Sequence, residues 1–72
     1  MKVFIVRDEE LNDVMGEKQL LDYAQEQYVA LKDSEGTDNE IVIKYKDGIN
    51  TVAEAIAVLV ERGFTVKIKE VF

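Results

Sequence analysis

The second half of the chain constrains the fold most. In the segment 40–46, the residues expected to face the core are Ile41, Ile43 and Tyr45, and those expected on the other side are Val42, Lys44 and Lys46. Apolar and polar residues also alternate over Phe64–Lys69, and this period of two predicts two half-buried strands. The residues between them carry apolar side chains at helical spacing. A helix between two strands returns the chain to the edge where the first strand began, so we expect the strands to be parallel and joined by a right-handed crossover.

The predicted helix has clear signals at both ends. Thr51 and Glu54 have the spacing of a capping box, and Gly63 supplies the left-handed residue that commonly ends a helix. The stripe expected to face the sheet consists of Val52, Ala55, Ile56, Leu59 and Val60. Ala53, Ala57 and Val58 lie outside that stripe, so the helix is apolar almost all round. Either the first helix of the chain covers this second surface, or a partner does.

The first half predicts another strand and a longer helix. Lys2–Arg7 is a strand with apolar residues on both sides, which favours a central position in the sheet. Val14 and Met15 can fold back as a short antiparallel partner of this strand. Gly16 is the expected helix cap, and the helix should run from about residue 17 to residue 32.

The predicted architecture is a single α/β domain over residues 1–72, with the order β-α-β-α-β, a three-stranded sheet and two layers. A central first strand would place the helices on opposite faces, and an edge position would place both on one face. Four lysines oppose the core-facing residues of their strands and favour two helices on one face, since a helix over them would bury their charges. They are Lys44, Lys46, Lys67 and Lys69. Keeping the open face soluble is their expected role, ahead of anion binding.

The net charge of −6 lies entirely in the first half of the chain. Residues 1–39 hold ten acids and four bases, whereas residues 40–72 hold five of each. An acidic chain is a poor ligand for phosphate backbones, which argues against nucleic acid as the partner. The N-terminal apolar run ends at Arg7, far short of a membrane span, so we expect a cytoplasmic protein without membrane contact.

Reactive side chains are scarce. The chain has no histidine and no cysteine, which removes the commonest general base and the strongest nucleophile. We therefore predict that the protein is not an enzyme, with no catalytic residue and no cofactor. Two acidic clusters are candidate cation sites: Asp8, Glu9, Glu10 and Asp13, and Asp33, Glu35, Asp38 and Glu40. Neither matches an EF-hand loop, so we interpret both as solvated turns and predict no metal site.

Three segments carry a family resemblance. They are Phe4-Ile-Val-Arg-Asp-Glu-Glu-Leu-Asn-Asp-Val-Met-Gly-Glu-Lys-Gln-Leu-Leu-Asp-Tyr-Ala24, Thr51-Val-Ala-Glu-Ala-Ile56 and Arg62-Gly-Phe-Thr-Val66. Together they resemble the small acidic uncharacterised proteins of Gram-positive phages and prophages. The resemblance implies a mobile-element setting and no established activity.

The leading functional hypothesis is a non-enzymatic protein-binding or regulatory module. The expected partner surface consists of Asp8, Glu9, Glu10, Asp13, Asp22 and Glu26. Two alternatives remain open. One is a structural homodimer that uses the apolar second helix or a sheet edge, and the other is a nucleic-acid mimic that blocks a DNA-binding protein.

Overall fold

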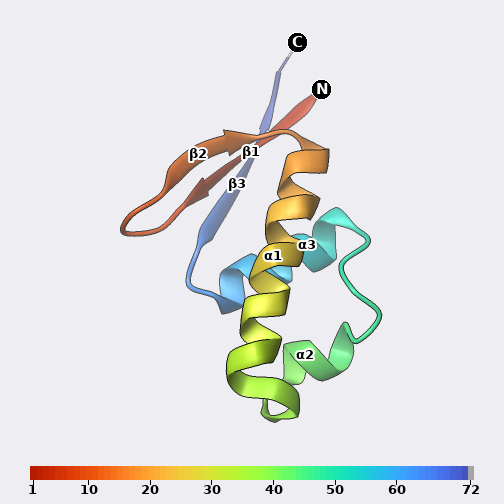
Figure 1. Cartoon of the computed structure of the whole chain (residues 1–72). Coiled ribbons are helices and arrows are strands. Elements are labelled where there is room, and N and C mark those ends of the chain that lie inside the picture. The colour runs from red at the N-terminus through yellow and green to blue at the C-terminus, as the bar shows by residue number, and fades with distance from the viewer. Residues whose placement is uncertain (72) are drawn as a thin grey trace.

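The computed structural model describes residues 1–71, which form a small antiparallel sheet packed against helices (Figure 1). The strands are β1 (Lys2–Arg7), β2 (Asn12–Met15) and β3 (Thr65–Glu70), in the order β2-β1-β3. β1 is antiparallel to both neighbours. The predicted class, a mixed α/β domain with a three-stranded sheet, is therefore confirmed, and β1 lies at the centre of the sheet.

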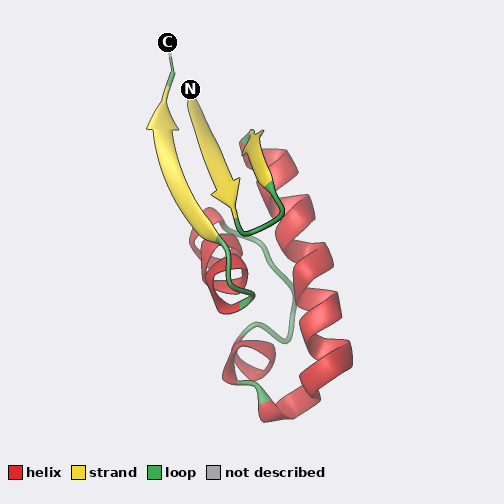
Figure 2. Cartoon of the chain, turned by 90° about the vertical axis from the view of Figure 1, so that its left-hand side faces the viewer, coloured by secondary structure: helices red, strands yellow, loops and turns green. Residues whose placement is uncertain are grey.

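Four helical segments connect β2 to β3. They are α1 (Glu17–Glu35), the short 3-10 turn η1 (Gly36–Asp38), α2 (Glu40–Lys44) and α3 (Val52–Glu61). α1 begins where the sequence predicts and extends three residues beyond the expected end at Lys32. Figure 2 looks onto the sheet, where the three strands lie side by side and the long α1 runs past β2.

The register separates the two faces of the sheet. Phe4 lies opposite both Met15 and Ile68, so all three side chains project from the same face. Phe4 and Met15 are buried there with Val6, whereas Ile68 is exposed near the end of β3. The other face carries Val3, Ile5, Val14, Lys67 and Lys69, of which none is fully buried. The core therefore lies against one face, and the location of both main helices on that face stays a prediction.

The predicted strand over Glu40–Lys46 is wrong, because this segment forms α2. The Asn39 side-chain oxygen accepts a hydrogen bond from the Ile41 amide at 2.8 Å and caps the helix. The Tyr28 hydroxyl, from α1, donates to the Val42 carbonyl at 3.1 Å. With the helix formed, Val42 is buried and Ile43 is exposed, the reverse of the orientation that the strand pattern predicts.

Because this strand is absent, the predicted order of the elements and the predicted direction of the strands are also wrong. The elements follow the order β-β-α-α-α-β, and the third strand of the sheet is β2, which follows β1 in a hairpin. Among residues 1–71, no pair of strands is parallel, so the predicted parallel pair and its crossover are wrong. Lys44 and Lys46 consequently lie outside the sheet, and of the four lysines only Lys67 and Lys69 lie on its open face.

α3 has the predicted capping box but a different buried side. The Thr51 hydroxyl accepts from the Glu54 amide at 3.2 Å, and the Glu54 carboxylate accepts from the Thr51 amide at 3.1 Å. The buried residues of α3 are Ala55, Val58 and Leu59. Val60 is 57% exposed although the sequence pattern places it in the core. The buried side is rotated because α3 contacts both α1 and β3, rather than a sheet alone.

Asn39 joins three helices through one largely buried side chain. Besides capping α2, its amide nitrogen donates to the carboxylates of Glu35 at 3.2 Å and Glu61 at 3.5 Å. These two acids belong to the ends of α1 and α3. A buried polar group with its partners in place orders its surroundings and is costly to leave unpaired.

We expect Asn39→Ala to lower the free energy of unfolding by about 1–2 kcal/mol, because it removes the cap and leaves two carboxylates without their donor. Asn39→Asp keeps the cap but adds a third carboxylate beside Glu35 and Glu61, so its penalty should shrink in mildly acidic buffer. Urea denaturation measures both. Asn12→Ala, at an exposed position of β2, is the control, and an equal loss there would contradict the role given to Asn39.

Candidate functional site

The turn between β1 and β2 presents the first group of predicted surface acids. The Asp8 amide donates to the Leu11 carbonyl at 2.9 Å and closes the hairpin. One carboxylate oxygen of Asp8 accepts from the amides of Glu10 and Leu11, at 2.8 and 2.6 Å. The Asp8 side chain therefore shapes the turn, as aspartate commonly does. Glu9 and Glu10 are left as the freely projecting acids.

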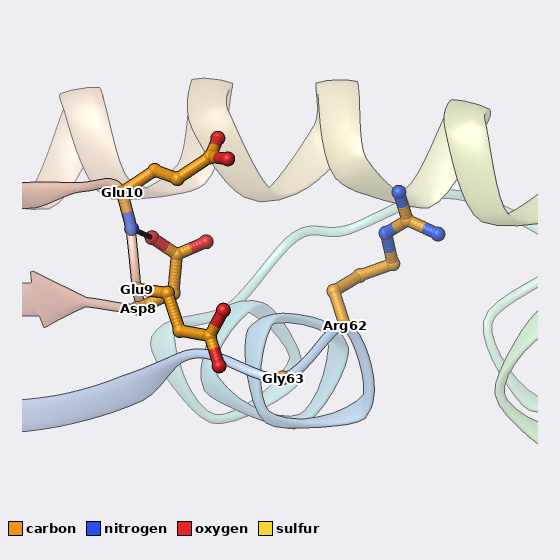
Figure 3. Close-up of a pocket in the computed structure, with 5 residues that line it drawn as sticks. All are labelled: Asp8, Glu9, Glu10, Arg62 and Gly63. Atoms are coloured by element: carbon orange, nitrogen blue, oxygen red, sulfur yellow. Dashed lines mark hydrogen bonds between the residues drawn. The ribbon is translucent and has the colours of Figure 1, made fainter.

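These acids border an open hollow of about 400 Å³ (Figure 3). Asp8, Glu9 and Glu10 line it from the hairpin, and Arg62 and Gly63 line it from the turn after α3. Two distant parts of the chain meet here because β1 and β3 pair antiparallel, with Arg7 opposite Thr65. The end of β1 consequently lies beside the start of β3.

The Arg62 guanidinium does not neutralise the acids of the hollow. It points toward α1 in Figure 3, and its Nε donates to the Gln27 side-chain oxygen at 3.1 Å. Over residues 1–71 the structure has a single salt bridge, between the N-terminal amine of Met1 and Glu70, with 3.3 Å between the charged atoms. The carboxylates of Glu9 and Glu10 are thus exposed and have no ion-pair partner within the described chain.

An aromatic contact joins α1 to the residue that follows Gly63. Tyr23 of α1 and Phe64 meet edge to face, with 5.7 Å between ring centroids. Phe64 directly follows Gly63, whose φ of 96° is easily adopted only by glycine. The turn after α3 is therefore tied to α1 by two contacts, the aromatic pair and the Arg62–Gln27 hydrogen bond.

The six predicted surface acids are divided among three elements. Asp8, Glu9 and Glu10 are brought together at the hairpin turn. Asp13 lies on β2, where its carboxylate accepts from the Val14 amide at 2.9 Å. Asp22 and Glu26 lie on the exposed side of α1 and do not line the hollow.

Sequence reasoning missed Arg62 and Gly63 as neighbours of these acids. The sequence predicts Gly63 as a helix stop, but nothing in the local pattern places it beside Asp8. The pairing of β1 with β3 is the signal that locates it, and the predicted parallel arrangement obscured that pairing.

The residues that line the hollow offer charged and hydrogen-bonding groups. Within residues 1–71, no three acids are grouped closely enough to hold a metal ion. The described chain also has no helix that is long and apolar enough to cross a membrane. Carboxylates on a defined turn, next to an arginine held by α1, are groups that recognise a complementary charged surface.

Comparisons with known proteins identify no relative of this chain. No protein-family model, curated protein or solved structure gives a significant match to this chain. The resemblance to phage and prophage proteins stays a prediction.

We expect Asp8→Ala to destabilise the protein by about 1–2 kcal/mol, because two amides of the hairpin turn lose their acceptor. Glu9→Gln should change the free energy of unfolding by no more than about 0.5 kcal/mol, as for other exposed sites. Urea denaturation measures the free energy of unfolding of both variants. Equal stability of both variants would show that Asp8 does not organise the turn.

Proposed function

We propose that this protein is a non-enzymatic protein-binding module whose hairpin acids contact a basic surface on a partner. The observation that carries the proposal is the exposure of Glu9 and Glu10 without ion-pair partners, on a turn that Asp8 defines. Exposed acids at a fixed position attract a complementary partner and select its orientation. The cytoplasmic setting and the phage or prophage origin belong to the same proposal.

Binding to a small basic site on a partner protein is favoured over mimicry of nucleic acid. Mimicry requires a continuous acidic stripe that reproduces the spacing of phosphates along a backbone. The six acids of the predicted surface instead lie on the hairpin turn, on β2 and on α1. A compact patch at the hairpin suits a small basic site on a folded protein.

The double variant Glu9→Gln/Glu10→Gln tests the proposal. We expect it to lose a partner that the unmodified protein captures from host lysate at low salt, because two exposed charges leave the contact surface while the turn is kept. Retention of that partner should also fall as the salt concentration rises. Screening limits the interaction between exposed charges to about 10 Å at 0.1 M ionic strength.

Asp33→Asn/Asp38→Asn is the matched control, because it removes the same charge from exposed positions in α1 and η1. The partner should remain bound to this control. If both double variants lose the partner equally, net charge rather than the hairpin governs binding. Capture that does not depend on salt would also contradict the proposal.

A second candidate function, the homodimer, is favoured by the outer side of α3. Ala53, Ile56, Ala57 and Val60 recur there at helical spacing, and none of them is fully buried. Val60 is 57% exposed. Val58 and Leu59 are buried on the opposite side of α3, and α3 contacts α1. A second copy that packs against this outer side would bury an apolar stripe on both molecules.

For the homodimer we expect light scattering at micromolar concentration to give twice the mass of the chain, and Val60→Asp to restore the monomer. Ile43→Asp is the matched control, since Ile43 is 55% exposed on α2 and lies outside the stripe. It should leave the dimer intact. A monomeric unmodified protein would exclude this second function and leave the first untouched.

A further inference from the structure

The open face of the sheet combines apolar and basic side chains in a fixed arrangement. Ile5 on β1 lies opposite Val14 on β2 and Lys67 on β3, and Val3 lies opposite Lys69. These five side chains therefore project from one face of three neighbouring strands. Val14 is 57% exposed, and both lysines are exposed. We call this set, Val3, Ile5, Val14, Lys67 and Lys69, the open-face patch.

The patch has the opposite charge to the protein as a whole. The strand residues that share its face include no acid, although the chain holds fifteen acids and has a net charge of −6. Neither Lys67 nor Lys69 forms a salt bridge with any described residue. Two lysines beside an apolar centre form a surface that is complementary to an acidic, partly apolar ligand.

We propose that the open-face patch binds an acidic amphipathic helix of a partner protein. A two-layer domain with one uncovered sheet face can accept a further helical layer. The outer strands of a three-stranded sheet lie about 10 Å apart, close to the diameter of one helix. Lys67 and Lys69 are separated by about 7 Å along β3, and acids at positions i and i+4 of a helix are about 6 Å apart along its axis.

A second copy of this chain and a nucleic acid fit the patch less well. A second copy that packed its own patch against this one would bring two basic surfaces together, which is unfavourable. Single-stranded nucleic acids bind sheet faces through exposed aromatic side chains, and the patch contains none. Two lysines can also neutralise only a few phosphates, and the chain as a whole has a net charge of −6.

The test uses a synthetic helical peptide with leucines along one side and glutamates flanking them at i and i+4. A second peptide keeps the leucines and replaces every glutamate by glutamine. Each is titrated into the isotope-labelled full chain while the backbone amide signals are followed by NMR. We expect the acidic peptide to shift the amides of β1, β2 and β3, and the glutamine peptide to bind about tenfold more weakly.

Lys67→Gln/Lys69→Gln should reproduce that loss of about tenfold with the acidic peptide. Lys44→Gln/Lys46→Gln removes the same charge outside the sheet and should not change the affinity. Val14→Thr, at an exposed position, tests the apolar contribution and should also weaken binding. Unchanged amide spectra of the free variants confirm that each one folds.

Several outcomes would overturn the proposal. They are the absence of sheet amide shifts with the acidic peptide, equal affinity for the glutamine peptide, and equal effects of the two lysine pairs. Stronger shifts of the same amides with single-stranded DNA would assign the patch to nucleic acid instead. Concentration-dependent shifts of the same amides without any peptide would assign it to a second copy of the chain.

Discussion

β1 is hydrogen-bonded along both edges, to β2 on one side and to β3, from the opposite end of the chain, on the other. This double pairing joins the first and last strands and closes the helical segments into one core. It also places the hairpin acids beside Gly63 and sets Lys67 and Lys69 on the same face as Ile5. Both surfaces for which we propose a function follow from this one arrangement.

The two proposed surfaces differ in charge and in how they are built. At the hairpin, Asp8 is committed to hydrogen bonds within the turn, so Glu9 and Glu10 carry the exposed charge. On the open sheet face, the lysines of β3 lie along one side of the apolar residues of β1 and β2. A protein with this separation of charge presents different ligand preferences on different sides.

Local signals predicted several elements accurately, and the failures are equally specific. Thr51 and Glu54 form both bonds of the capping box because all the groups involved lie within one helical turn. For Glu40–Lys46 the apolar residues satisfy both an alternating and a helical pattern. The Asn39 cap and the Tyr28 hydroxyl decide in favour of the helix, and Tyr28 lies on another element. At the site, the acids were identified from sequence, whereas Arg62 and Gly63 were not, because only strand pairing brings them close.

The sequence by itself determined β1, α1, the capped start of α3, and the mixed α/β class, since each depends on residues near one another in the chain. The tertiary structure decided the antiparallel order of the strands, the helical state of α2 and the buried side of α3. It also decided which charged residues share a surface. These properties depend on contacts between segments far apart in sequence, and a local pattern contains no information about which distant segment will pack against it.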